Sequence, residues 1–311
     1  MEIYDWKEIK DQKPTAVALG FFDGIHLGHK ALIDEMINIA KKRNFESCLV
    51  TFRQHPLTLV FPKFAPKLLS SNDEKIDVLG EMDIDKLVFI EFSEEIMNYE
   101  PEEFIREILI KKLNAKTIVV GFNYNFGKKG QGTPEILIEL KDKYDYDVKV
   151  VNPVEKDGQI ISSTFIRNLV VNGKVDQAEK YLGRKFSVKG EVVRGKGLGR
   201  QYAIPTANIT VEEEHILPDA GVYYTNILVK GVKYEGLTNI GYNPTFENHP
   251  FSVETYIYDF DEDIYGETVE LIFNKKIRKE KKFEDLKDLI KQIKNDIETV
   301  ETKYINKGKY R

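Results

Sequence analysis

The chain has 311 residues, of which 41% are hydrophobic and 31% are charged. This length is about twice the ~150 residues of a common single domain, and the composition excludes wholesale disorder and collagen-like repeats. The net charge of -5 argues against nucleic acid as the main partner, and a single cysteine, Cys48, excludes an internal disulfide and a multi-cysteine metal site.

The beginning of the chain is charged from its second residue, whereas a signal peptide has an uninterrupted apolar core after a basic opening. No stretch approaches the ~20 apolar residues that a helix needs to span a bilayer. Together with the low cysteine content, these features predict a cytoplasmic protein without a membrane partner. Nothing in the sequence indicates the oligomeric state.

Short apolar runs alternate with segments of helical periodicity from the N-terminus to about Gly183. This alternation is typical of a parallel sheet built from crossover units, so we expect a doubly wound α/β domain. The expected strands are 16–21, 48–52, 87–92, 117–122 and 148–151, and the expected helices are 30–42, 101–113, 134–144 and 176–182.

Beyond Gly183 the apolar runs are closely spaced and of β type, which predicts an antiparallel barrel or sandwich. Apolar residues at spacings of three and four predict a terminal amphipathic helix over 283–300. Since Gly183 suits the end of a helix, we expect the two domains to be 1–183 and 184–311. The expected strands are 187–194, 222–229, 232–237, 253–258 and 268–273, with a hairpin turn at 230–231.

The first motif, 20–29, joins the first strand of the predicted sheet to a helix, where open α/β sheets bind ligands. Glycines let the backbone approach a phosphate, and His26 and His29 share one helix face, where two imidazoles suit an anion. Two unrelated histidines are the alternative. The candidate phosphate-binding residues of this motif, besides the histidines, are Gly20, Phe22, Asp23, Gly24 and Gly28.

A second motif, 161–167, reads I-S-S-T-F-I-R. It places Ser162, Ser163 and Thr164 at a helix start and the guanidinium of Arg167 one turn later, which suits phosphate binding. Alone, the segment is equally compatible with an ordinary helix cap. Paired with the first motif, it resembles the second hallmark of the nucleotidylyltransferase superfamily. The resemblance implies nucleotidyl transfer, in which a phosphate oxygen attacks the α-phosphorus of a nucleoside triphosphate and pyrophosphate leaves.

Two further segments lie at the ends of expected strands, at the same predicted crevice. The glycine-rich loop 121–132 carries two lysines and aromatic residues that suit a flat ring, and 51–56 is a polar strand end. A flexible surface loop and a solvated turn remain the alternatives for them.

A glycine-rich basic loop in the second domain, with Gly195, Lys196 and Gly199, leads into P-T-A-N at 205–208. Such a loop suits phosphates, and Thr206 and Asn208 offer the hard oxygen ligands that Mg²⁺ prefers. We therefore expect magnesium and ATP here.

Glu254 lies in an expected strand, where alternation puts it on the face opposite Val253. If it faces a cavity, it is placed to accept a proton from a substrate hydroxyl during phosphoryl transfer, whereas an exposed strand carboxylate is the alternative. The acidic run 259–263 fits a solvated turn better than a metal site.

The first two motifs resemble those of the nucleotidylyltransferase superfamily. With the P-T-A-N segment, the chain resembles the bifunctional prokaryotic riboflavin kinase/FAD synthetase family over nearly its whole length. Segments similar to the kinase part of that family are 218–223, 239–246 and 277–283.

The resemblance implies a Rossmann-like nucleotidylyltransferase domain followed by a riboflavin-kinase β-barrel with a terminal helix. It implies that the C-terminal domain phosphorylates riboflavin to FMN, with Glu254 as base and Thr206 and Asn208 arranging magnesium. The N-terminal domain would transfer AMP from ATP to FMN and form FAD. The residues that would handle its triphosphate are His26, His29, Ser163, Thr164 and Arg167. The flavin-side residues implied are Asn123, Asn125, Phe126 and Arg278.

Several positions depart from the usual pattern of that family. Asn123 and Asn125 stand where Asp and Arg are common, Phe165 where Arg is frequent, Gln54 where Pro is common and Ala203 where Gly is common. None removes a phosphate or metal group, so we expect both activities. The alternatives are one retained activity, a flavin-nucleotide sensor without catalysis, or a barrel that binds single-stranded nucleic acid, which the acidic balance and P-T-A-N disfavour.

Overall fold

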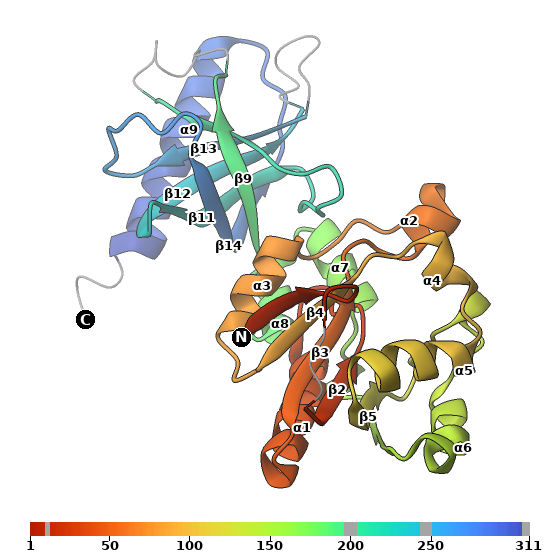
Figure 1. Ribbon diagram of the computed structural model, residues 1–311. Helices are drawn as coiled ribbons and strands as arrows, with labels where there is room; N and C mark the ends of the chain where they lie inside the picture. The colour runs from red at the N-terminus through yellow and green to blue at the C-terminus, as the bar shows by residue number, and fades with distance from the viewer. Residues whose placement is uncertain (10–12, 196–203, 243–250, 307–311) are drawn as a thin grey trace. The chain divides into compact units, whose positions relative to one another are not determined.

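The computed structural model describes residues 1–9, 13–195, 204–242 and 251–306. The chain forms two compact units, Met1–Ser163 and Thr164–Arg311. The first unit contains a β-sheet covered by helices, and the second contains a β-barrel (Figure 1).

The sheet of the first unit has six parallel strands in the order β1-β4-β3-β2-β5-β6. Strands β3 and β4 lie on one side of β2, and β5 and β6 lie on its other side. The strand order therefore reverses between β2 and β5, and sheets of this kind bind ligands at such a point. The strands are β1 (Glu2–Asp5), β2 (Thr15–Leu19), β3 (Glu46–Phe52), β4 (Lys86–Ile90), β5 (Ala115–Gly121) and β6 (Asp147–Val151), followed by the small hairpin β7 (Glu155–Lys156) and β8 (Gln159–Ile160).

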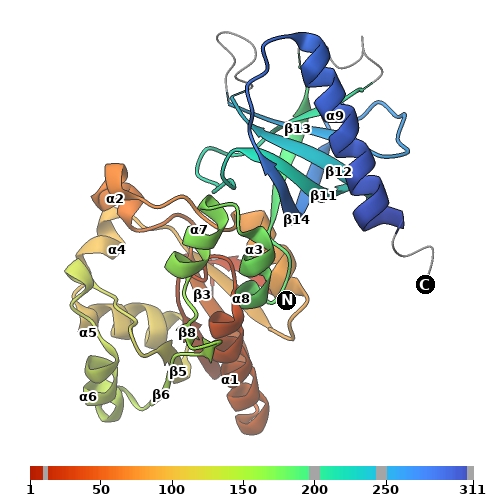
Figure 2. The ribbon, with the colours of Figure 1, turned by 180° about the vertical axis from the view of Figure 1, so that it is seen from behind.

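Helices cover both faces of this sheet (Figure 2). Alternation along β2 directs Ala16 and Ala18 to one face and Val17 and Leu19 to the other. On the first face lie α1 (Leu27–Arg43) and α3 (Asn72–Gly80). On the second lie α5 (Pro101–Phe104), its π-helical continuation Ile105–Lys112 and α6 (Pro134–Tyr144). The shorter helices are α2 (Leu57–Val60) and α4 (Glu94–Asn98).

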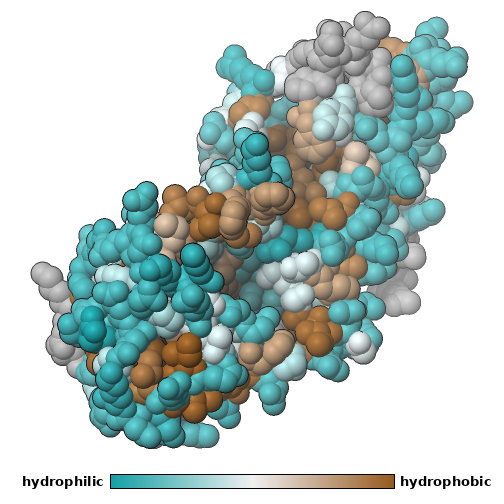
Figure 3. All heavy atoms as spheres, turned by 90° about the vertical axis from the view of Figure 1, so that its right-hand side faces the viewer, coloured by the Kyte–Doolittle hydropathy of each residue, from teal (hydrophilic) through white to brown (hydrophobic). Residues whose placement is uncertain are grey.

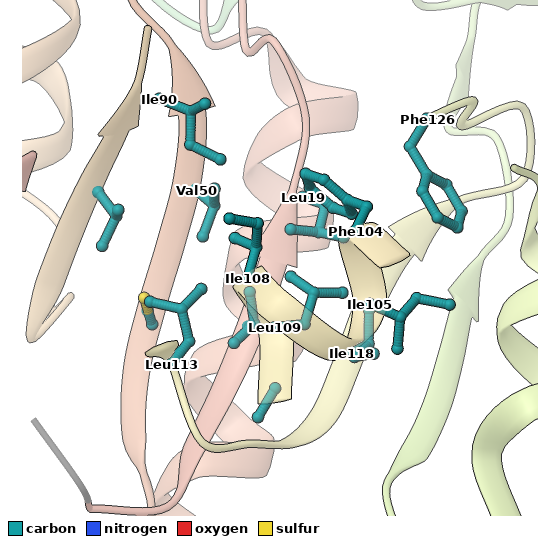
Figure 4. Packing of buried hydrophobic residues seen from close by; sticks show 14 of the residues in the cluster. Leu19, Val50, Ile90, Phe104, Ile105, Ile108, Leu109, Leu113, Ile118 and Phe126 are labelled. Carbon is teal, nitrogen blue, oxygen red and sulfur yellow. The ribbon is translucent and has the colours of Figure 1, made fainter. Parts of the chain in front are cut away.

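The core of the second face is formed by aliphatic and aromatic side chains from the strands and from residues 104–113 (Figure 4). Phe104, Ile108 and Leu109 pack toward Leu19 and Ile118 of the sheet. Their removal from water is the main force that holds the helix on the strands, at about 25 cal/mol per Å² of apolar surface.

The second unit begins with α7 (Ser163–Val171), whose first residue closes the first unit, and α8 (Val175–Leu182). Helix α8 packs against β14 (Thr268–Lys279) of the barrel. Gly173, between the helices, has a φ of 69°, and a Cβ there would lie 2.8 Å from the Lys276 side chain. The backbone conformation therefore favours glycine at this position.

The barrel is closed in the order β10-β13-β12-β11-β14-β9, and its pairs are antiparallel. Its hairpin turn at Lys230 and Gly231 has φ values of 50° and 82°, as a tight turn with two left-handed residues requires. The strands are β9 (Ser187–Val193), β10 (Ala207–Thr210), β11 (Gly221–Val229), β12 (Val232–Gly241), β13 (Ser252–Ile257) and β14 (Thr268–Lys279).

The terminal helix α9 (Leu286–Val300) covers part of the outer face of the barrel (Figure 2). Val300 and Ile297 pack against Val222 and Leu237, and the Tyr258 hydroxyl donates to the Ile297 carbonyl over 2.9 Å. This docking explains the apolar spacing of the segment.

The two fold classes and the terminal helix predicted from the sequence are confirmed. Strands β1 and β10 were not predicted, because each has only four residues and weak alternation. The predicted helix 101–113 is α-helical only at its start and then π-helical. The predicted boundary at 183/184 follows the sequence motifs, whereas the compact units divide at 163/164.

The surface in view is mainly hydrophilic, with hydrophobic residues in separate patches (Figure 3). Within the described part of the chain, the helices are too short or too polar to cross a membrane.

Candidate active sites

The turn between β2 and α1 has an unusual backbone. Phe22, Gly24 and Ile25 have φ values of 52°, 78° and 38°. Ile25 is β-branched and fully buried, so its left-handed conformation is costly and must be imposed by the surrounding structure. Backbone strain of this kind is found at functional sites.

His26 forms the N-cap of α1. Its Nδ1 accepts the backbone N–H of His29 over 3.2 Å, and the two imidazoles stack with centroids 3.6 Å apart and planes 15° apart. A Cβ at Gly28 would lie 3.2 Å from the His26 ring, which explains the glycine between the two histidines. The cap and the helix dipole together make this end of α1 favourable for an anion.

The ring of His29 is held in its neutral form. Burial, followed by the nearby His26 and Lys75, places the pKa of His29 well below its usual value. Its Nδ1 is buried and, among the described residues, has no hydrogen-bond partner, while the Phe22 ring lies edge-on to it at 5.2 Å. His29 therefore offers a neutral imidazole rather than a positive charge.

Residues 69 and 70, which the sequence analysis did not predict, form hydrogen bonds with the turn between β2 and α1. The Asp23 carboxylate accepts the backbone N–H groups of Leu69 and Ser70 over 2.8 and 3.3 Å, and the Ser70 hydroxyl accepts the N–H of Gly24 over 3.0 Å. Asp23 is 1% exposed. The carboxylate therefore fixes the backbone, and the candidate role of Asp23 in phosphate binding would be exerted through the turn.

The second motif meets the first at Ser163. The Ser163 hydroxyl donates to the Asp23 carbonyl over 2.9 Å, and the Ile161 carbonyl lies 3.7 Å from the position of a Gly28 Cβ. Ser162 precedes α7, and Thr164 and Arg167 lie within it, as half-buried or exposed residues of the second unit. Within the first unit, Ser163 of the second motif therefore contacts the turn of the first motif.

Strand ends β3 and β5 contribute further residues beside this turn. Thr51 donates to the Phe21 carbonyl over 3.0 Å, and the His55 ring lies edge-on to Phe21 at 4.8 Å. After β5, Asn123 and Asn125 are exposed, and the Asn125 amide donates to the Asn123 carbonyl over 3.0 Å.

Phe126 lies in the core beneath this loop. It is 6% exposed, and its ring packs on Phe104 and Tyr124. A Cβ at Gly132 would lie 2.7 Å from the Phe126 ring, so the loop closes tightly over it. The exposed aromatic residue of this loop is Phe122, at 47%.

The barrel carries a separate row of polar residues. Glu254 on β13 lies directly opposite Asn208 on β10 and Asn239 on β12. The three side chains share the outer face and are half-buried, and the Ser252 hydroxyl donates to the Glu254 carboxylate over 3.0 Å. A carboxylate between two carboxamides is an arrangement of oxygen ligands and hydrogen-bond partners suited to a polar substrate.

The P-T-A-N motif supplies one member of this row, Asn208. Thr206 is half-buried just before β10, and a Cβ at Gly195 would lie 2.2 Å from the Asn208 Nδ2, so the backbone at Gly195 lies directly over the Asn208 amide. Lys196 and Gly199 lie outside the described residues. The sequence analysis did not assign Asn239 to the site.

Arg278 on β14 lies opposite Val222 of β11, which in turn lies opposite Asn239 of the polar row. Its Nε and Nη2 both lie 2.8 Å from the Asp296 Oδ2 of α9. The Asp296 side chain is 5% exposed and also accepts from Gln292. Arg278 therefore connects the strand to the terminal helix.

The donor set at the barrel fits Mg²⁺. Within the described ranges there is no group of three or more His, Cys, Asp or Glu that suits a metal ion. Asn208 instead supplies a neutral hard oxygen opposite the Glu254 carboxylate, and Thr206 supplies a second one two residues earlier in the chain. Magnesium usually binds through few protein oxygens and completes its octahedron with waters and substrate phosphates, so this set is sufficient.

Comparison with protein-family models gives two matches, one for each half. The FAD synthetase model matches residues 8–165, and the riboflavin kinase model matches residues 182–304. Helix α8 lies almost entirely between the matched segments.

Two curated relatives match nearly the full chain. One, from Listeria monocytogenes, is 34% identical over 94% of this chain and 92% of its own length. The other, from Buchnera aphidicola of Schizaphis graminum, is 36% identical over 98% of this chain and 97% of its own length. Both are named bifunctional riboflavin kinase/FMN adenylyltransferase.

A solved structure has the same fold. The Streptococcus pneumoniae protein described as a macrolide-efflux protein has a TM-score of 0.84 and 34% identity, covering 94% of this chain and 96% of that chain. Its description differs from the names of the curated relatives, which have similar identity and coverage.

Proposed function

Since the chain belongs to the bifunctional riboflavin kinase/FMN adenylyltransferase family, we propose that its two reactions take place at the two sites described above. The chain is a transferase: its C-terminal domain phosphorylates riboflavin to FMN, and its N-terminal domain adenylylates FMN to FAD with release of pyrophosphate. ATP is the co-substrate of both steps. We assign adenylyl transfer to 1–183 and kinase activity to 184–311, because the second phosphate motif lies in α7.

In adenylyl transfer, an FMN phosphate oxygen bonds to the α-phosphorus of ATP as the bond to pyrophosphate breaks. We assign the triphosphate to the turn of Gly20–Gly28, with His26 and the free N–H groups of α1 facing it. Because His29 is neutral, it can donate one hydrogen bond but contributes no positive charge. The guanidinium of Arg167, together with Ser162, Ser163 and Thr164, supplies further phosphate contacts.

We assign the flavin side of this site to the loop after β5. Asn123 and Asn125 are exposed there, just after the carboxyl end of β5, one of the two strands between which the strand order reverses. Phe126 supports the loop from the core. The aromatic face available to a flat ring in this loop is that of Phe122.

In the kinase reaction, the ribityl hydroxyl oxygen of riboflavin bonds to the γ-phosphorus of ATP as the bond to ADP breaks, and we assign the hydroxyl proton to Glu254. The observation that carries this assignment is the position of Glu254 directly opposite Asn208. Thr206 and Asn208 would hold Mg²⁺, which when bound neutralises charge on the phosphate oxygens. Gly195, with Lys196 and Gly199, is assigned to the ATP phosphates, and Arg278 to the flavin side.

We further propose a cytoplasmic location and small-molecule substrates, with neither nucleic acid nor a membrane as a partner. The net charge of -5 supports the absence of nucleic acid among the partners.

The direct test is to incubate the purified chain with riboflavin, ATP and Mg²⁺ and to separate the flavins chromatographically over time. FMN followed by FAD is expected, and EDTA is expected to stop both steps. FMN alone would show that only the kinase is active, and a second incubation started from FMN tests the other half. No turnover in either incubation, with tight flavin binding, would support a sensor instead.

A further inference from the structure

A lysine outside every motif of the sequence analysis is buried beside the adenylyl-transfer site. Lys75 lies in α3 and is 1% exposed. Its Nζ donates to the Phe21 carbonyl over 3.1 Å and lies 4.2 Å from the centroid of the Phe21 ring. Burying an ammonium group is costly unless its charge is compensated, so its position calls for a reason.

Phe21 links β2 to the strained turn, and its carbonyl accepts two hydrogen bonds. The second donor is the Thr51 hydroxyl, over 3.0 Å. Phe22, with its left-handed backbone, follows at once. Lys75 and Thr51 thus fix the point at which the chain leaves the sheet and enters the turn that carries His26.

Helix α3 is itself held firmly. Ser71 and Glu74 form a capping box, with the Ser71 N–H donating to Glu74 over 2.8 Å and the Glu74 N–H donating to Ser71 over 3.2 Å. Leu79, with 0% exposure, anchors the other end in the core. The segment 69–75 therefore holds the turn at Phe21, Asp23 and Gly24 from one side.

The charges around Lys75 belong to the same turn. Asp23 attracts the ammonium, and the ammonium in turn lowers the pKa of His29, on which His26 is stacked. Glu74, the neighbour of Lys75 in α3, is tied to the Ser71 backbone. Burial lowers the pKa of Lys75 to about 8, partly offset by Asp23.

We propose that Lys75 is a positioning residue for adenylyl transfer, which holds the Phe21–Gly24 turn in its active form and maintains a positive charge beneath it. This inference rests on the assignment of adenylyl transfer to the start of α1. A triphosphate carries several negative charges, and a fixed cation below its binding turn favours both its binding and the charge that develops on the departing pyrophosphate.

The test compares Lys75→Met and Lys75→Arg with the unmodified full chain, using kcat/KM for ATP in FMN adenylylation between pH 6.5 and 10. The unmodified chain is expected to lose activity above about pH 8, as the ammonium loses its proton. Lys75→Met is expected to lower kcat/KM at pH 7 about 100-fold and to abolish this alkaline decrease. Lys75→Arg is expected to retain more activity at pH 7, because it keeps the charge, and also to lack the decrease near pH 8.

Two controls separate positioning from simple stability. Lys86, also buried at 2%, pairs with Glu46 at the opposite end of the sheet, and Lys86→Met is expected to keep the alkaline decrease. The riboflavin kinase rate of each variant reports on the rest of the chain and is expected to stay within about twofold. An unmodified chain that makes no FAD would refute the underlying site assignment rather than the role of Lys75.

The proposal is overturned if Lys75→Met keeps the activity or the pH profile of the unmodified chain, or if Lys86→Met loses the alkaline decrease as well. If Lys75→Met does not fold, Lys75→Arg decides alone. An unchanged decrease near pH 8 in that variant overturns the proposal, and its disappearance supports it.

Discussion

His26 accepts the backbone N–H of His29 through Nδ1 and stacks its ring on that of His29, 3.6 Å between centroids. One side chain therefore caps α1 and positions the second imidazole. Like charges at this separation would repel strongly, so the two rings are not both positively charged. The two histidines of the motif thus have unequal roles. His26 caps α1 in addition to its proposed contact with phosphate.

These two roles of His26 can be separated by substitution. Asparagine is a good N-cap but lacks the imidazole, so His26→Asn is expected to keep the helix while lowering the FMN adenylylation rate about 10²- to 10³-fold. The riboflavin kinase rate of the same preparation is expected to stay within about twofold. Unchanged adenylylation in His26→Asn would refute the assignment of this ring to the triphosphate.

The neutral His29 makes the first unit sensitive to acid. Its pKa is below the unfolded value of 6.5, so as pH falls below about 6.5 the unfolded chain takes up a proton that the folded chain does not. Stability therefore decreases as pH falls, by up to about 1.4 kcal/mol per pH unit for this group. His29→Gln is expected to show a smaller decrease between pH 7.5 and 5.5.

Urea unfolding followed by tryptophan fluorescence measures this effect. Trp6 is the single tryptophan of the chain and lies in the core of the first unit, so its emission reports on that unit. If His29→Gln loses as much stability as the unmodified chain over this pH range, the ring is not held neutral by the fold.

The sequence could propose only those candidate site residues that lie within one continuous motif. The glycines and histidines of 20–29 and the hydroxyls of 162–164 are candidates because their spacing and their place after a strand are visible in one chain segment. Lys75 and Ser70 were missed because their partners, Phe21 and Gly24, lie far away in the sequence. Such hydrogen bonds depend on how loops meet in the folded chain, which periodicity does not encode.

The residues that surround Glu254 in the barrel could not be predicted from the sequence. Alternation predicted that Glu254 and Val253 lie on opposite faces, but it did not show which residues stand beside Glu254. The register of β13 with β10 and β12 places Asn208 and Asn239 on either side of it. Because β10 has four residues and weak alternation, this register was not accessible from the sequence.

Glu254→Gln tests the role of this carboxylate as a base. The substitution keeps the size and hydrogen-bonding capacity of the side chain but removes its ability to take a full proton, so riboflavin phosphorylation is expected to fall about 10²- to 10⁴-fold. Adenylylation of added FMN is expected to be unchanged.

Glu235 provides a matched control for this substitution. It lies on β12 of the same barrel and accepts from Tyr224 over 2.8 Å and from Asn226 over 2.7 Å. Glu235→Gln is expected to reduce stability more than kinase rate. Equal kinase losses in the two variants would show that Glu254 acts through the barrel structure and not as a base.

A ladder of three threonines crosses the interior of the barrel. The Thr238 hydroxyl lies 2.8 Å from that of Thr225 and 2.9 Å from that of Thr255, and all three residues have 0% exposure. Thr238→Val keeps the shape but leaves both neighbouring hydroxyls without their shared partner. Each buried hydroxyl that loses its partner costs about 1–3 kcal/mol, so the barrel is expected to unfold at a lower temperature.

The replacement of all three threonines by valine tests whether the loss of stability in Thr238→Val comes from hydroxyls left without a partner. No hydroxyl then remains without a partner, and the variant is expected to be more stable than Thr238→Val in spite of carrying two more substitutions. Heat inactivation of the riboflavin kinase activity measures both variants in the full chain. If the triple variant loses at least as much stability as the sum expected from three single Thr→Val changes, the ladder is not a coupled hydrogen-bond chain.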